Sequence, residues 1–109
     1  MENQFFLEHD TGSEPLARVA AKLAGYAELR AAGGPRHRVC FWLPSTAREA
    51  HLRRLLAEHP GPVATATASA ELADALSTGP AGAIWLPVGA ERRRRLAGLA
   101  DPRRSTTPR

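Results

Sequence analysis

The sequence predicts an α/β fold, in which a mostly parallel sheet of about four strands alternates with helices. Three observations lead to this prediction. Short apolar runs typical of strands recur along the chain, helical runs with apolar residues three and four positions apart separate them, and glycine or proline stands at most boundaries. Helices between successive strands are the connections that parallel strands require.

The first strand is expected at residues 4–10, which are rich in aromatic side chains. Thr11 and Glu14 have the spacing of a capping box, and Pro15 suits the first turn of a helix. This helix is expected to continue to about Ala32, because two glycines and a proline follow it.

The second strand is continuously apolar, which predicts a position at the centre of the sheet. Ser45 or Thr46 is expected to cap the helix that follows, and Ser69 is expected to cap a shorter one. The remaining elements are expected in this order: a strand at 38–43, a helix at 46–58, a strand at 63–67, a helix at 70–76, a strand at 82–88 and a helix at 91–99.

Composition excludes several classes of protein. No apolar run reaches the roughly 20 residues of a membrane span, and the first residues do not have the pattern of a secretion signal. Cys40 is the only cysteine, so an internal disulfide and a cysteine-built zinc site are both excluded. A cytoplasmic domain is therefore expected, with Trp42, Trp85 and Cys40 in its core.

The net charge of +4 comes from the end of the chain. Residues 1–90 carry eight basic and nine acidic side chains, whereas residues 91–109 carry seven arginines and two acids. We expect an α/β domain at 1–90 and a basic helix with a disordered tail at 91–109. The arginines either contact a DNA backbone or form a solvated surface, and the candidate contacts are Arg92, Arg93, Arg94, Arg95, Arg103 and Arg104.

Acidic residues near the end of the first strand are the main candidates for chemistry. Glu8 and Asp10 share one face of that strand, at the end where open α/β sheets bind ligands. Lys22 lies at the boundary of the apolar face of the next helix and could lean over both acids. Two carboxylates suit Mg²⁺, and a lysine can stabilise phosphate charge. These residues suggest a metal-dependent phosphodiesterase centre, with Glu14 as a further candidate.

A simpler interpretation stands beside this one. Asp10 and Glu14 could stabilise the amino end of the helix. Glu14, Arg18 and Lys22 are four residues apart, so they could form a ladder of solvated ion pairs. Glu8 is explained least well in this way, because it lies inside a strand.

Two segments, residues 5–16 and 22–26, resemble the replication-relaxation family of actinobacterial plasmids and integrated elements. Weaker similarity continues through residues 41–49 and 84–88 in the same order, so that the resemblance covers about residues 4–99. The family looks like a winged-helix DNA-binding region followed by a restriction-endonuclease-like domain.

The resemblance implies a role for three residues. Glu8 would match the acidic position of the nuclease motif, Asp10 takes the position of its lysine, and Lys22 would be a migrated lysine. The strand that carries the other acid of the motif would precede the first residue, so we expect a chain truncated at its N-terminus. Its metal centre, with Mg²⁺ held by Glu8 and Asp10, would then be incomplete.

The sequence therefore predicts a DNA-associated accessory domain in plasmid or mobile-element replication. Catalysis by this chain alone is not expected; if the centre works, it is a Mg²⁺-dependent DNA phosphodiesterase. The alternatives are a non-catalytic binding or protein-interaction module, and an inert remnant that associates with itself or with a partner supplying a missing strand.

Overall fold

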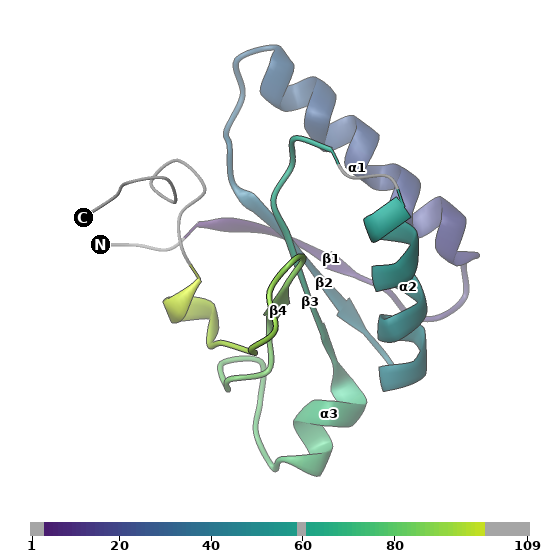
Figure 1. The fold of residues 1–109 in the computed structure, drawn as a ribbon, viewed down its shortest axis with the longest axis vertical. Coiled ribbons are helices and arrows are strands. Elements are labelled where there is room, and N and C mark those ends of the chain that lie inside the picture. The colour runs from purple at the N-terminus through teal and green to yellow at the C-terminus, as the bar shows by residue number, and fades with distance from the viewer. Residues whose placement is uncertain (1–3, 59–60, 100–109) are drawn as a thin grey trace.

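Strands and helices alternate in the computed structural model, which describes residues 4–58 and 61–99 (Figure 1). The prediction of an α/β fold with four strands, mostly parallel, is confirmed for this part of the chain. The elements are β1 (Phe5–His9), α1 (Leu16–Ala31), β2 (Arg38–Leu43), α2 (Thr46–Glu58), β3 (Thr65–Ser69), α3 (Ala70–Ala75), β4 (Leu86–Pro87) and the 3₁₀ helix η1 (Leu96–Gly98).

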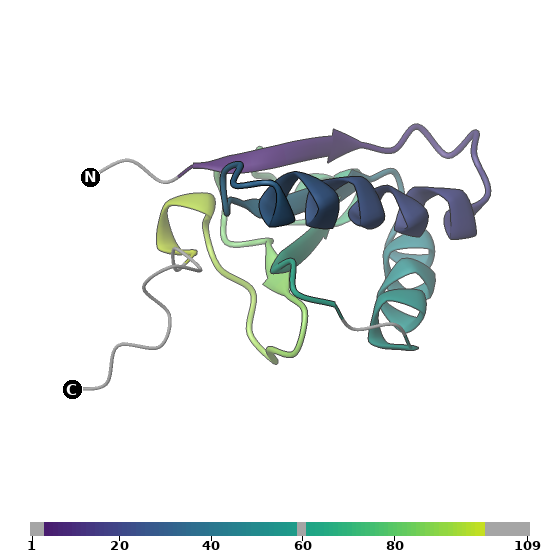
Figure 2. The ribbon, with the colours of Figure 1, turned by 90° about the horizontal axis from the view of Figure 1, so that it is seen from above.

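The strands lie in the order β1-β2-β3-β4. β1, β2 and β3 are parallel, and β4 runs antiparallel to β3. The apolar strand β2 lies inside the sheet, as its continuous hydrophobicity predicts, and pairs Cys40 with Leu7 of β1 and with Ala66 of β3. β1 is an edge strand (Figure 2). The carboxyl ends of the three parallel strands therefore meet at one end of the sheet, beside the start of α2.

Side chains of β2 alternate between two apolar cores. Val39, Phe41 and Leu43 pack with apolar residues of α1 and α2, whereas Cys40 packs with a second cluster around Ile84 and Trp85. Figure 1 shows α1 and α2 over one face of the sheet and the segment with β4 and η1 on the other side. Trp42 and Trp85 pack against each other with ring centroids 5.8 Å apart, which confirms the predicted core positions.

The capping prediction for α1 is wrong. The helix begins at Leu16 after Pro15, and no side chain caps it. Thr11 instead hydrogen-bonds to Ser13, because the turn at Gly12, with φ of +88°, and the extended conformation of Pro15 separate Thr11 from the helix. The other two predicted caps are present, since Ser45 Oγ accepts from the Arg48 amide and Ser69 Oγ accepts from the Leu72 amide.

The predicted helix at residues 91–99 is also wrong. Only Leu96–Gly98 are helical, as a 3₁₀ turn, and Arg94 instead exchanges backbone hydrogen bonds of 2.7 and 2.9 Å with Trp85. Leu96 and Leu99 pack on the cluster around Trp85. Strand-like pairing and apolar burial thus outweigh the helical pattern of the sequence. The predicted strand at 82–88 is reduced to Leu86–Pro87, and the predicted disordered tail lies outside the described residues.

Candidate functional site

Glu8 lies in the middle of a cluster formed by β1 and α1. Its Oε2 accepts a hydrogen bond from the Tyr26 hydroxyl, and its Oε1 lies 3.5 Å from Lys22 Nζ. Tyr26 and Lys22 are four residues apart on α1 and therefore present their side chains to the same strand. The Lys22–Glu8 contact is the one that helix periodicity predicts, and the catalytic role of both residues stays a prediction.

Lys22 is shared between two carboxylates. Its Nζ lies 3.2 Å from Glu14 Oε1, closer than it lies to Glu8. The hydrogen bond that Lys22 donates to Glu14, followed by the charges of Glu14 and Glu8, holds the pKa of Lys22 above its ordinary value. The ammonium group thus stays protonated at neutral pH, which suits it to stabilise negative charge and not to abstract a proton.

Tyr26 is the most perturbed acid of this cluster. Burial, then the hydrogen bond to Glu8 and the charge of Glu8, raises the pKa of Tyr26 to about 12. Its ring also packs against the ring of Phe6 in β1, with centroids 4.9 Å apart and a tilt of 34° between the ring planes. A protonated phenol that donates to Glu8 fixes the direction of that carboxylate.

Asp10, just beyond the end of β1, belongs to a second polar contact. Both of its carboxylate oxygens accept hydrogen bonds from the Arg48 guanidinium of α2, and one also accepts from the Gly12 amide at 3.2 Å. Arg48 Nη2 additionally donates to the Glu14 carbonyl at 2.5 Å. The hydrogen bonds from Arg48 hold the pKa of Asp10 below its ordinary value. The buried Asp10 carboxylate therefore joins β1, α2 and the segment before α1.

These acids do not fit the expected Mg²⁺ site. Asp10 is bound by Arg48 at both oxygens, and the two oxygens of Glu8 contact Tyr26 and Lys22. Within residues 4–58 and 61–99, no group of three or more His, Cys, Asp or Glu side chains is arranged to hold a metal ion. A divalent cation needs open oxygen ligands and water, and here protein cations already neutralise both carboxylates.

A buried polar network lies between α2, β3 and the C-terminal segment. Glu49 is only 1% exposed, and its carboxylate accepts from Thr67 Oγ1 at 2.7 Å and from both Nη atoms of Arg93, at 2.8 and 3.1 Å. Arg53 donates to Thr67 Oγ1 at 2.9 Å and to the carbonyl oxygens of Leu86 and Pro87. Burial lowers the pKa of Arg53.

The sequence prediction did not include this network. One signal was available, because Glu49 shares the spacing of Leu52 and Leu56 on the inner face of α2. A glutamate on a buried helix face requires a cation. The choice of Arg93, 44 residues away, depends on the fold alone.

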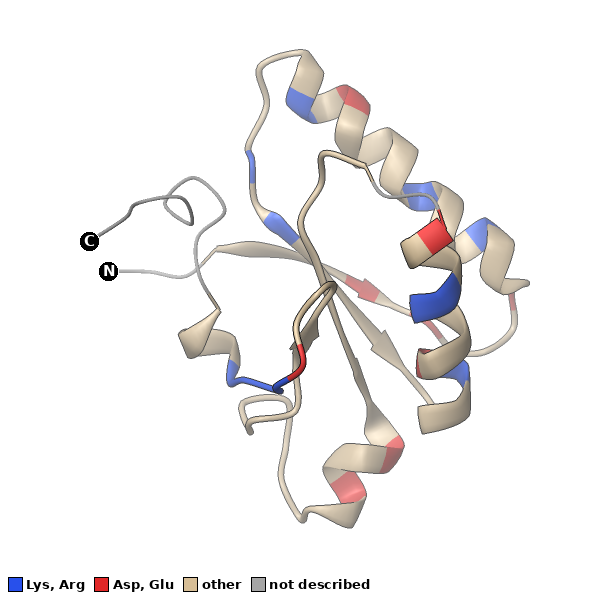
Figure 3. Ribbon diagram, viewed as in Figure 1, with Lys and Arg blue, Asp and Glu red and all other residues tan. Residues whose placement is uncertain are grey.

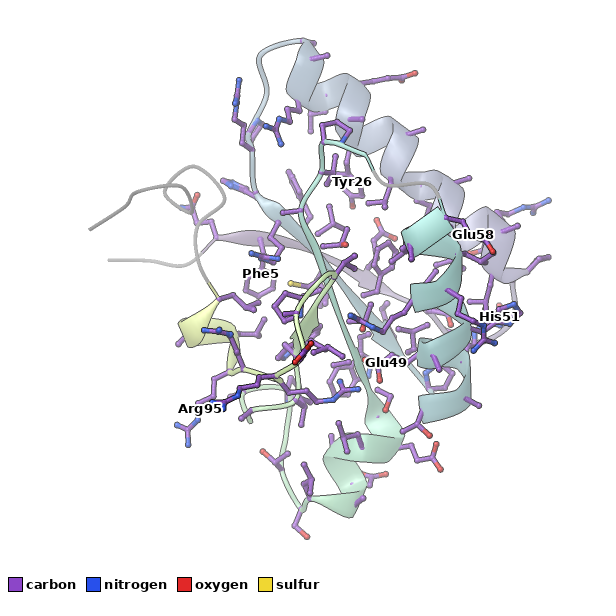
Figure 4. The ribbon with its side chains drawn as sticks, viewed as in Figure 1. Phe5, Tyr26, Glu49, His51, Glu58 and Arg95 are labelled. Carbon is purple, nitrogen blue, oxygen red and sulfur yellow. The ribbon has the colours of Figure 1, made fainter. Side chains whose placement is uncertain are left out.

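The predicted DNA contacts fall into three groups. Arg92, Arg94 and Arg95 are exposed, and in the described part of the chain no acidic side chain pairs with them. Figure 3 shows this basic stretch on the segment that precedes η1, and Figure 4 shows Arg95 directed away from the domain. Arg93 is different, because it faces inward and pairs with Glu49. The last two predicted contacts, Arg103 and Arg104, lie outside the described residues.

Comparison with known protein families gives a match to the first part of the chain. The replication-relaxation family matches residues 1–40, a stretch that includes β1 and α1 and reaches into β2. No curated protein and no solved structure gives a significant match. Of the helices that the structure describes, none has the length and apolar character needed to cross a membrane. The matched residues contain Glu8, Asp10, Glu14, Lys22 and Tyr26, and this match supports a relationship of the chain to the replication-relaxation family.

Proposed function

We propose that the chain is a DNA-associated accessory domain that acts in the replication of a plasmid or another mobile element. The observation that carries this proposal is the match of residues 1–40 to the replication-relaxation family. The exposed arginines near the C-terminus supply a chemistry that suits the same role. A cytoplasmic location, where such DNA is present, belongs to the same proposal.

The DNA contact is formed by Arg92, Arg94 and Arg95. They lie next to one another on a segment that is attached to the domain, and guanidinium groups bind phosphate oxygens in a two-pronged geometry. Contacts of this kind set affinity and register but do not read bases. The domain therefore binds duplex DNA without sequence preference, and any target selection depends on other parts of the replication machinery.

A binding assay with matched charge changes tests this proposal. The variant R92A/R94A/R95A and the control R18A/R36A/R54A each remove three exposed arginines, from different surfaces. Anisotropy of a fluorescein-labelled duplex should show about tenfold or greater loss of affinity for the first variant and a much smaller loss for the control. Equal losses would show that net charge alone determines binding, and the proposed surface would be wrong.

The nuclease-like centre of this domain is degenerate. Glu8 and Asp10 serve as ion-pair partners, and Lys22 holds two carboxylates together. We expect no nicking of supercoiled plasmid in Mg²⁺ or Mn²⁺ above the background of the Glu8→Ala and Lys22→Ala variants. Metal-dependent nicking by the native chain that both variants lose would instead establish an active phosphodiesterase centre.

The second candidate function is a protein-interaction module. In the described part of the chain, β1 pairs only with β2, and Leu7 in the middle of this edge strand is 56% exposed. An open strand edge with an exposed apolar side chain favours the addition of a further strand. Light scattering over a range of concentrations tests self-association, which a Leu7→Lys variant should abolish if the edge of β1 is the contact.

A further inference from the structure

The segment that carries the exposed arginines is attached to the domain at two adjacent residues. The Arg93 guanidinium binds Glu49 through two nitrogen atoms and also donates to the Ile84 carbonyl at 2.7 Å. Arg94, the next residue, exchanges two backbone hydrogen bonds with Trp85. The side chain of one arginine and the backbone of its neighbour thus fix the same point of the chain.

Glu49 makes this attachment hard to break. Glu49 is a buried residue of α2. Besides Arg93, its carboxylate accepts a hydrogen bond from Thr67. Release of Arg93 would leave the buried Glu49 carboxylate without its ion-pair partner, which is strongly unfavourable. Glu49 therefore holds the Arg93 side chain against the domain. The position of Arg93 in turn determines where the exposed side chains of Arg92 and Arg94 lie.

We propose that Arg93 is a positioning residue, which with Glu49 holds Arg92, Arg94 and Arg95 as a preorganised phosphate-binding surface. This inference rests on the proposed DNA-binding function. Four consecutive arginines then have two roles, because the half-buried Arg93 is the anchor and the other three are presented to DNA. Fixing the segment before binding reduces the conformational entropy that would otherwise be lost on the DNA.

The Glu49→Gln variant separates this proposal from simple charge attraction. It removes one negative charge, so attraction by charge alone predicts equal or tighter DNA binding. Loss of the anchor predicts the opposite, a weakening of about three- to tenfold, because one or two phosphate contacts are no longer held in place. Glu58→Gln is the matched control, since Glu58 is exposed on the same helix and the charge change is identical (Figure 4).

Arg93→Lys provides a second test that leaves the net charge unchanged. Lysine cannot reproduce the two-pronged contact with Glu49, so this variant should also bind the labelled duplex more weakly. Hydrogen exchange at the Arg94 amide, measured without DNA, should be faster in both anchor variants than in the native chain and in Glu58→Gln.

The outcomes distinguish the two proposals. Weaker binding by Glu49→Gln and Arg93→Lys, with Glu58→Gln equal to or tighter than the native chain, supports the positioning role. Binding by Glu49→Gln as tight as that of Glu58→Gln overturns it, while leaving the DNA-binding function in place. If the native chain does not bind the duplex at all, the proposed function fails and the positioning role fails with it.

Discussion

Asp10 and Arg48 are 38 residues apart in the sequence and form a two-bonded ion pair where β1 ends and α2 begins. Arg48 also binds the Glu14 carbonyl, so one guanidinium connects α2 with both ends of the segment between β1 and α1. The pair occupies the position where the sequence predicts a metal-binding carboxylate. Its arrangement favours a structural role for Asp10.

Replacing Asp10 with Asn should destabilise the domain by about 2 kcal/mol at neutral pH, because the largely buried Arg48 loses its counter-charge. The pKa of Asp10 is lowered in the folded state, so its stabilisation is present above the unfolded value, near 3.8, and is lost as pH falls through the folded value. In urea unfolding, the difference in unfolding free energy between the native chain and the variant should therefore become smaller below about pH 4. A difference in unfolding free energy that stays constant with pH would contradict the lowered pKa of Asp10 in the folded state.

Tyr26 is the only tyrosine in the chain, so its ionisation can be followed directly by absorbance. Burial and Glu8 raise its pKa to about 12, and Glu8→Gln should lower the measured value toward the ordinary 10.0. Circular dichroism recorded in parallel identifies the pH range in which the domain stays folded. Titration near 10 in the folded native chain would show that the Tyr26–Glu8 contact is absent.

The caps of α3 and α1 give a paired prediction. Ser69→Ala should lower the free energy of unfolding by about 1 kcal/mol, because the Leu72 amide loses its acceptor. Thr11→Ala should have little effect, since Thr11 does not cap α1. Thermal or urea unfolding measures both changes, and a cost for Thr11→Ala equal to that for Ser69→Ala would restore the capping-box interpretation.

Thr67 connects Glu49 with Arg53, and this connection predicts the effect of a nearly isosteric change. Thr67→Val should destabilise the domain by about 2 kcal/mol, because it removes a buried donor to Glu49 and an acceptor for Arg53. Thr65→Val, on the same strand, is the control, since the hydrogen bonds with Glu49 and Arg53 are made by Thr67. Equal unfolding free energies for the two variants would contradict the network.

The fold was predictable where local pattern decides it. The apolar run of β2 and the helical spacing of α1 and α2 are properties of short windows, and the order of these elements requires parallel pairing. Residues 91–99 were not predictable in this way. Their conformation is determined by Trp85 and Glu49, which the segment meets only in the folded chain.

The candidate site shows the same division. Helix periodicity was sufficient to predict the contact between Lys22 and Glu8, because it involves only one strand and the next helix. Asp10 could not be assigned from its neighbours, since its partner Arg48 comes from a helix beyond β2. A sequence window identifies which residues carry charge, and the tertiary fold determines which charges neutralise one another.

The dependence of DNA affinity on salt tests the central claim most directly. Each arginine–phosphate contact contributes about 0.9 to the slope of log affinity against log salt concentration. If Arg92, Arg94 and Arg95 contact the backbone, R92A/R94A/R95A should reduce the slope by about 2 to 3, whereas R18A/R36A/R54A should leave it nearly unchanged. An unchanged slope for the first variant would contradict the proposed DNA surface.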